Sequence, residues 1–252
     1  KILSLPDGDY TTSVFDGEVL TAINQPIGQF YGYQTRGVFA TAEAASAANL
    51  SYRTSTGLLI PFTAGDVIFS DNYPDGVIDE KDKTVIGNSQ PDFYGNISLS
   101  TRYKQLKLDV LFNYVYGNEI YNYLRSQLES GSSYYNQTSA MLNRWRSEGQ
   151  TTEMPKSTFS DPKGNNRFSD RWIEDGSYIR LKNFQLSYEL PVNSTYIQGF
   201  TVWAAVSNLI TFTKYLGVDP EFSGSNNILY QGIDSGILPQ SRSFNVGLKI
   251  NL

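Results

Sequence analysis

The final stretch of the chain, residues 243–252 (SFNVGLKINL), alternates without exception between polar and apolar side chains. A period of two residues is the period of a β-strand, so the pattern predicts a strand with all its apolar side chains on one face. About ten residues is also the length that a tilted strand needs to cross a bilayer. A strand of a soluble β-sandwich shows the same alternation, so this stretch alone allows both folds. Its apolar positions are Phe244, Val246, Leu248, Ile250 and Leu252.

The same alternation returns in four earlier stretches, at residues 93–103, 106–116, 184–190 and 200–212. A two-residue link separates the first two stretches, which is enough for the turn of a β-hairpin. Ile179 and Leu181 come shortly before the third stretch and have the opposite phase. This change of phase predicts a β-bulge near Lys182 and Asn183, or the point at which the strand leaves the membrane.

The connections between these stretches differ strongly in length. Short links follow Tyr103 and Leu190, whereas long segments precede Pro91 and occupy residues 117–170 and 213–240. Tight turns on one side and large loops on the other are typical of outer-membrane barrels. The sequence therefore predicts an all-β fold made of antiparallel transmembrane strands with long extracellular loops. The alternative is a soluble, secreted β-sandwich that binds glycans, in which the apolar face would pack on a second sheet instead of lipid.

Composition excludes several classes of protein. No apolar run approaches the length of about 18 residues that a transmembrane helix needs. The chain has no Cys and no His, so the usual catalytic triads and His- or Cys-ligated zinc sites are absent, and we expect no enzyme activity. A net charge of −5 argues against a nucleic-acid partner, which would require a basic face. The opening KILSLPDGDY is not a signal peptide, so we expect a removed signal or a piece of a longer protein.

An acidic loop at residues 71–82 (DNYPDGVIDEKD) is similar to the calcium-binding loop D-x-[DN]-x-[DN]-G. Ca²⁺ requires six to eight oxygen ligands, and the glycine permits the sharp turn that gathers them. Tyr73 occupies the third loop position, where a ligand is expected. We expect a structural Ca²⁺ that stiffens an external loop, with a solvated acidic turn as the alternative. The candidate ligands are Asp71, Asp75, the carbonyl of Val77, Asp79 and Asp82.

Aromatic residues in the predicted loops are the candidates for substrate contact. They are Tyr134, Tyr135, Trp145 and Trp172. Such rings can stack on the faces of sugars or peptides, but aromatic residues next to a bilayer also serve as interfacial anchors.

Four segments resemble the SusC/RagA type of TonB-dependent outer-membrane transporters of Bacteroidetes. They lie at residues 25–39, 65–100, 171–191 and 206–221, and the stretches SYIRLKN and NLITFTKYLGVDPE are the most distinctive. The resemblance covers nearly the whole chain and identifies it as the C-terminal part of such a transporter. Residues 1–5 have the pattern of a strand end. We expect residues 1–91 to hold this strand end and a large external loop with the acidic turn, and residues 92–252 to hold barrel strands and further loops.

The resemblance also implies partners. A transporter of this type has a barrel of about 22 strands, an N-terminal plug and a TonB-contacting segment, both absent from this chain. A SusD/RagB-like surface lipoprotein closes over the barrel, and the substrates are oligosaccharides or oligopeptides. We expect roughly six membrane strands in the whole chain, and an unclosed sheet edge is not viable in lipid. The chain must therefore pair with the remaining barrel in the outer membrane.

Overall fold

The computed structural model describes residues 1–5, 8–192, 196–222, 227 and 230–251. The chain forms two compact units that interleave along the sequence, and each is described by itself. The loop unit comprises Lys1–Gln90, Glu119–Glu174 and Ser223–Ile237, and the sheet unit comprises Pro91–Asn118, Asp175–Phe222 and Leu238–Leu252. No helix among the described residues is long and apolar enough to cross a membrane.

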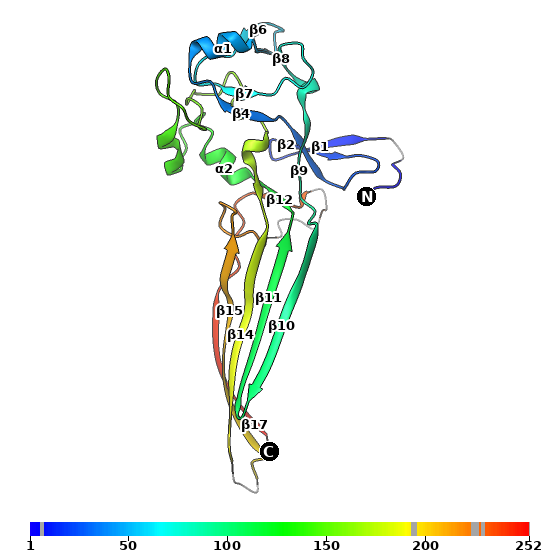
Figure 1. The fold of residues 1–252 in the computed structure, drawn as a ribbon, viewed down its shortest axis with the longest axis vertical. Helices are drawn as coiled ribbons and strands as arrows, with labels where there is room; N and C mark the ends of the chain where they lie inside the picture. Colours follow the sequence, from blue (N-terminus) through cyan, green and yellow to red (C-terminus); the bar gives the residue numbers. More distant parts are fainter. Residues whose placement is uncertain (6–7, 193–195, 223–226, 228–229, 252) are drawn as a thin grey trace. The chain divides into compact units, whose positions relative to one another are not determined.

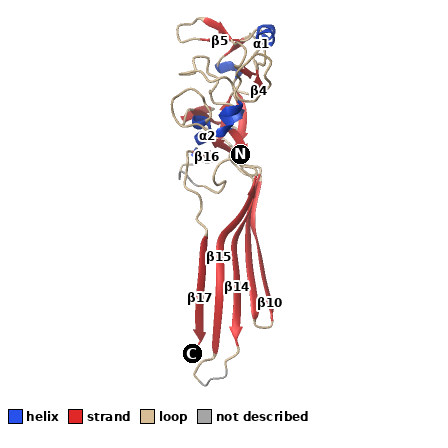
Figure 2. Ribbon diagram, turned by 90° about the vertical axis from the view of Figure 1, so that its left-hand side faces the viewer, coloured by secondary structure: helices blue, strands red, loops and turns tan. Residues whose placement is uncertain are grey.

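The sheet unit contains one antiparallel sheet in the order β10-β11-β14-β15-β17. Figure 2 shows these strands side by side. All five alternating stretches of the sequence lie in this sheet, and the last predicted apolar position, Leu252, lies outside the described residues. The strands are β10 (Phe93–Tyr103), β11 (Leu106–Tyr116), β14 (Tyr178–Leu190), β15 (Gly199–Thr213) and β17 (Ser243–Asn251).

Residues that pair across neighbouring strands share a face of a sheet. In this sheet the register places most of the apolar side chains of the five strands on the same face. Val246 and Phe244 on this side are 79% and 72% exposed. A β-sandwich would bury them under a second sheet, so the structure favours a sheet whose apolar face meets lipid. Members of this apolar face include Ile97, Leu99, Leu108, Val110, Phe112, Phe184, Leu186, Val202, Val206, Phe244, Val246 and Leu248.

The predicted bulge in β14 is confirmed. The pairing of β14 with β15 shifts between Leu181 and Asn183, and its pairing with β11 shifts at the same level. On the opposite strand Asn208 adopts a φ of 54°, a left-handed conformation that asparagine tolerates better than most residues. Because of the extra residue, Ile179 and Phe184 lie on the same face despite their opposite phase in the sequence.

The two ends of this sheet differ as predicted. Residues 104–105 and 191–198 make the links at one end, whereas residues 117–177 and 214–242 connect strands at the other end (Figure 1). Lys104 has a φ of 54°, which suits the tight hairpin between β10 and β11.

The loop unit is built from short strands and few helices. Its four-stranded sheet comprises β1 (Tyr10–Val14), β2 (Gly17–Thr21), β3 (Gln29–Gly32) and β9 (Thr84–Asn88). The smaller sheets pair β4 (Thr35–Val38) with β7 (Val67–Phe69), β5 (Ser51–Arg53) with β6 (Leu59–Pro61) and β8 (Val77–Ile78), and β12 (Glu119–Asn122) with β13 (Ile173–Asp175) and β16 (Ile233–Asp234). The helices are α1 (Ala42–Ala48), α2 (Tyr123–Leu128) and the 3₁₀ turns η1 (Glu80–Asp82), η2 (Ser139–Asn143) and η3 (Asp170–Trp172).

One expected strand end is absent. The sequence suggests the end of a strand at residues 1–5, but the structure assigns no strand there. Ile2 exchanges only two backbone hydrogen bonds, with Asn24 and Gln25, and so short a contact does not build a ladder.

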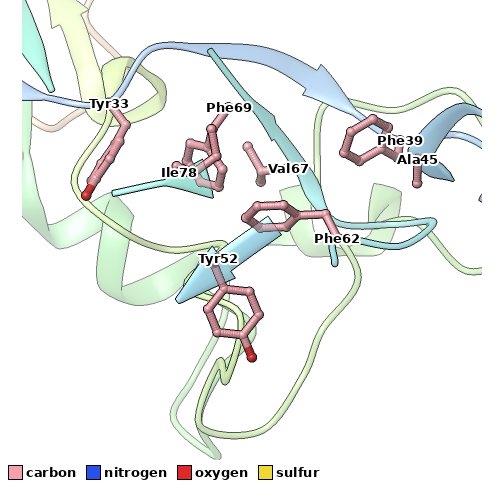
Figure 3. Packing of buried hydrophobic residues seen from close by; sticks show 8 residues of the cluster. All are labelled: Tyr33, Phe39, Ala45, Tyr52, Phe62, Val67, Phe69 and Ile78. Carbon is pink, nitrogen blue, oxygen red and sulfur yellow. The ribbon is translucent and has the colours of Figure 1, made fainter. Parts of the chain in front are cut away.

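Two hydrophobic clusters hold the loop unit together. The first contains Tyr33, Phe39, Ala45, Tyr52, Phe62, Val67, Phe69 and Ile78 (Figure 3). The second contains Val14, Val19, Phe30, Tyr121, Phe168, Trp172 and Ile233. Each cluster gathers residues far apart in the sequence, so the short strands are positioned by tertiary packing more than by local propensity.

Candidate functional site

The loop unit contains two adjoining cavities that share Tyr33, Glu80 and Arg167 as lining residues. Their volumes are about 250 and 390 Å³, at the lower end of the range for small-ligand sites. We call them together the Tyr33 cleft. The smaller cavity is also lined by Glu18, Tyr31 and Lys83, and the larger by Tyr52, Arg53 and Asp79.

Lys83 is held by carboxylates in this cleft. Its Nζ lies 2.5 Å from Glu18 and 2.5 Å from Glu80, and 5.6 Å from the centre of the Tyr33 ring. Burial alone would lower the pKa of Lys83, but the hydrogen bonds to Glu18 and Glu80 hold it above its ordinary value. Lys83 is therefore a cation that is already neutralised by its own neighbours.

Arg167 is held in a different way. Its guanidinium lies 5.0 Å from the ring centre of Tyr33 and 4.7 Å from that of Phe69, within the range of cation–π contacts. Its Nε and Nη2 donate to the backbone carbonyls of Gly164 and Lys163 at 2.8 and 2.9 Å. Burial lowers the pKa of Arg167 and raises the pKa of the Tyr33 phenol.

A buried carboxylate fixes the segment that carries Arg167. Asp66 accepts hydrogen bonds from Lys163 at 2.8 Å and Asn165 at 3.0 Å, and it pairs with Lys156 at 3.0 Å. Asn165 in turn accepts from the backbone of Val67 in β7 at 2.8 Å. Burial would raise the pKa of Asp66, but these hydrogen bonds outweigh it and hold the pKa below its ordinary range. The sequence gives no signal for this arrangement because its members lie about a hundred positions apart.

The residues predicted to bind calcium lie in one loop, but their carboxylates bond to the loop's own backbone. Asp71 accepts the backbone N–H of Gly76, Asp75 that of Val77, and Asp79 that of Lys81. Asp82 accepts those of Tyr73 and Asp79. All five distances are 2.9 to 3.0 Å. Within the described ranges, no three acidic side chains converge as a metal site requires. The carboxylates accept backbone hydrogen bonds in this structure, and calcium binding stays a prediction. Titration of the intact receptor and an Asp71→Asn variant with Ca²⁺ tests it, because only the unmodified loop should bind.

Two of the four predicted substrate aromatics have packing roles in the structure. Trp172 is 1% exposed in the second hydrophobic cluster, within cation–π distance of the guanidinium groups of Arg125 and Arg171. Trp145 is half-buried and its Nε1 donates to the carbonyl of Ala40 at 3.1 Å. The structure therefore does not bring the four residues to one surface.

The other two aromatics are open to solvent. Tyr135 is exposed, and Tyr134, which is 90% exposed, lies beside Phe159, which is 61% exposed; their ring centres are 4.9 Å apart. A backbone hydrogen bond of 2.8 Å from Ser160 to Ser132 joins the two segments that carry these rings. We call Tyr134 and Phe159 the aromatic platform. Sequence reasoning missed Phe159, because only tertiary contact brings it next to Tyr134.

In the sheet unit, four charged residues join the two most distinctive stretches of the sequence. Arg180 of β14 pairs with Asp219 and, at 2.9 Å, with Glu221, and Lys182 pairs with Glu221 at 2.9 Å. Arg180 is 3% exposed and Asp219 is 7% exposed. Asp219 also accepts the backbone N–H of Gln240 at 2.8 Å, close to the start of β17. We call these four residues the Arg180 network.

Comparison with known proteins agrees with the family resemblance. No family model matches this sequence. TonB-dependent receptor P3 of Formosa agariphila is 33% identical over 266 aligned positions, covering 99% of this chain and 25% of the relative. TonB-dependent receptor SusC of Bacteroides thetaiotaomicron is 29% identical over 195 positions, covering 73% of this chain and 17% of the relative. The chain belongs to the TonB-dependent receptors, as part of a receptor of the SusC/RagA type, and it spans about a quarter of the length of the Formosa receptors P3 and P26.

Solved structures show the same fold. The RagAB peptide importer in its closed-closed state matches with a TM-score of 0.71 at 23% identity, covering 98% of this chain and 25% of that one. The RagAB peptide transporter matches with a TM-score of 0.73 at 23% identity, covering 96% and 24% of the two chains. The predicted fold class, antiparallel strands of a large transmembrane barrel with long loops, is therefore confirmed, and the open five-stranded sheet is one part of that barrel.

Proposed function

We propose that this chain is part of a TonB-dependent importer of the bacterial outer membrane that takes up oligosaccharides or oligopeptides. The observation that carries the proposal is the exposed apolar face of the sheet unit, in a chain that belongs to this receptor family. Among the strands that the structure describes, the edge strands β10 and β17 each have one side without a partner strand. Because lipid cannot satisfy free backbone groups, these edges would pair with strands of the remaining barrel.

The opposite face of the sheet supports a solvated interior. Ser100 donates to Asp109 at 2.6 Å, Lys107 pairs with Asp109 at 2.9 Å, and Arg102 pairs with Glu189. Charged residues in a membrane barrel face water, not lipid. The candidates for lining the lumen are Asn96, Ser98, Ser100, Arg102 and Lys107, all of which are exposed.

The proposed partners follow from the family. They are the remaining barrel and plug of the same receptor, a SusD/RagB-like surface lipoprotein, TonB through a segment outside this chain, and outer-membrane lipid. We expect no nucleic-acid partner, since the chain carries a net charge of −5. The absence of Cys and His favours a transport role without catalysis.

Within this proposal, Tyr134 and Tyr135 contact the substrate, and Phe159 contributes through the aromatic platform. Exposed rings offer flat faces for stacking on sugar rings or peptide groups. Residues 130–143 (SGSSYYNQTSAMLN), which include Tyr134 of the platform, contain no charged side chain. They are rich in hydroxyl and amide groups. Uncharged hydrogen-bonding groups around an aromatic face suit a neutral ligand segment.

The test is to delete the receptor gene in its native host and to complement it with tagged receptor. The proposal expects the tagged protein in the outer-membrane fraction, soluble only in detergent, together with a surface lipoprotein. It also expects the deletion to abolish growth on one defined oligosaccharide or peptide source, and complementation to restore it. Recovery of the protein in the soluble fraction, alone and without detergent, would refute the proposal.

A further inference from the structure

Arg167 is a fixed cation that forms no direct ion pair within the described residues. None of the ion pairs found there includes it. Asp161 and Glu80 act on the guanidinium only through space, and Glu80, like Glu18, binds Lys83. Asp161 accepts the backbone N–H groups of Asn165 and Asn166 at 2.8 and 2.7 Å. A cation in such surroundings is stabilised further by an anion from outside the chain.

The guanidinium is also pre-oriented. A guanidinium has five N–H donors in a rigid plane, and two backbone carbonyls take two of the five on Arg167. The rings of Tyr33 and Phe69 restrict its position (Figure 3 shows both rings), and Asp66 fixes the backbone that carries it. A fixed guanidinium binds a carboxylate with little loss of side-chain entropy, and often through two parallel hydrogen bonds.

The cleft around Arg167 limits the kind of anion that fits. Arg167 lines both cavities, of about 250 and 390 Å³, and so does Glu80. The two cavities are lined by four carboxylates, those of Asp16, Glu18, Asp79 and Glu80, so a polyanion would be repelled. The tyrosines at positions 31, 33 and 52 offer ring faces to an uncharged body of the ligand. The surroundings therefore suit one carboxylate on an otherwise neutral or zwitterionic ligand.

We propose that Arg167 is the carboxylate-binding residue of the Tyr33 cleft and selects ligands that carry a single carboxylate. This inference rests on the proposed importer function and adds the chemical class of the group recognised at this cleft. The same carboxylate chemistry is found at the C-terminus of a peptide and on a uronic acid in an oligosaccharide, and the probes below distinguish the two.

The experiment measures binding to the intact receptor, purified with its lipoprotein, by isothermal titration calorimetry. The probes are tetra-alanine with a free carboxylate against its C-terminal amide, and a neutral tetrasaccharide ending in one uronic acid against the methyl ester of that acid. In at least one pair we expect the free acid to bind about tenfold tighter, as for a charge-assisted bidentate contact. The pair that shows the preference identifies the source of the carboxylate.

Variants separate recognition from packing. Arg167→Gln should remove the preference for the free acid, whereas Arg167→Lys should keep part of it. Since Arg167 also packs on two rings, Glu80→Gln provides a second variant that leaves this packing in place. It should strengthen binding of the free acid severalfold by removing a nearby negative charge. Arg146→Gln, at an exposed arginine of the loop unit that does not line the Tyr33 cleft, is the matched control and should change neither affinity.

Equal affinities within each pair for the unmodified receptor, or no binding of either free acid at millimolar concentration, would overturn the inference. A preference that survives Arg167→Gln in a folded receptor would also overturn it. Each of these three results leaves the proposed function standing if the receptor remains in the outer membrane and supports growth. Failure of localisation and growth would instead remove the proposed function.

Discussion

Breaking the Arg180 network is the perturbation whose outcome the structure predicts most sharply. Asp219→Asn removes one negative charge and leaves one side-chain oxygen, whereas the carboxylate uses Oδ1 for the backbone N–H of Glu221 and Oδ2 for that of Gln240. Arg180 is 3% exposed and would keep Glu221 as its carboxylate partner. Removing one partner of a buried ion pair costs about 3–5 kcal/mol, and the retained partner places this variant near the lower end, at about 3 kcal/mol.

The sheet unit offers a matched control. Arg102 and Glu189 form an ion pair on the same sheet, but their side chains are 58% and 46% exposed. Exposed pairs contribute about 0–1 kcal/mol because water and salt screen them. Glu189→Gln should therefore lower the free energy of unfolding by less than about 1 kcal/mol. The assay is guanidinium-induced unfolding of the intact receptor in detergent, followed by tryptophan fluorescence.

A double-mutant cycle completes this test. In an Arg180→Met background the charge that Asp219 neutralises is absent, so Asp219→Asn should cost much less than it does alone. Equal costs for Asp219→Asn and Glu189→Gln would refute the reasoning. Additive costs of Arg180→Met and Asp219→Asn would refute it as well, since they would show that the two residues do not interact.

Three further predictions concern the loop unit. The pKa of Asp66 in the folded protein is lower than its ordinary value of 3.8, so the ionised carboxylate stabilises the fold above that value. This stabilisation is lost as the pH falls through the folded pKa. The difference in free energy of unfolding between the unmodified protein and Asp66→Asn, measured by chemical unfolding, should therefore shrink below about pH 4. Trp172→Ala should lower the free energy of unfolding by about 3–5 kcal/mol because it empties a buried site, whereas Tyr134→Ala should change it by less than about 0.5 kcal/mol and weaken substrate binding instead. Gly76 has a φ of 75°, and a Cβ there would lie 3.3 Å from the carbonyl of Asn49; Gly76→Ala should cost about 1–2 kcal/mol, and thermal unfolding that matches the unmodified protein would contradict this.

The sheet could be predicted from the sequence because one physical requirement dominates it. A strand with lipid on one side and water on the other must alternate, and a single extra residue reverses the phase. This is why the sequence alone predicts the bulge near Lys182 that the strand pairing shows. The missing strand at residues 1–5 shows the limit, since a short apolar stretch without a sustained period has no such requirement.

The loop unit could not be predicted in the same way because its environments arise from tertiary contacts. Trp172 looks like a loop aromatic in the sequence, and only the packing of β12 and β16 around it makes it a core residue. The acidic loop matches a calcium pattern by residue type, but the directions of its side chains depend on which backbone N–H groups they meet. The position of Arg167 beside Tyr33 joins residues from distant segments, and no local pattern indicates it.

The central claim is that one face of the five-stranded sheet meets lipid and the other meets water. The most direct measurement places single cysteines at Val246 and Asn245, adjacent residues of β17, in a cysteine-free background of the intact receptor reconstituted in lipid. The account predicts that a spin label at position 246 is relaxed by oxygen dissolved in the bilayer, and that a label at position 245 is relaxed by a water-soluble nickel complex. Equal access of the nickel complex to both positions would contradict it, because the apolar face would then not lie in the membrane.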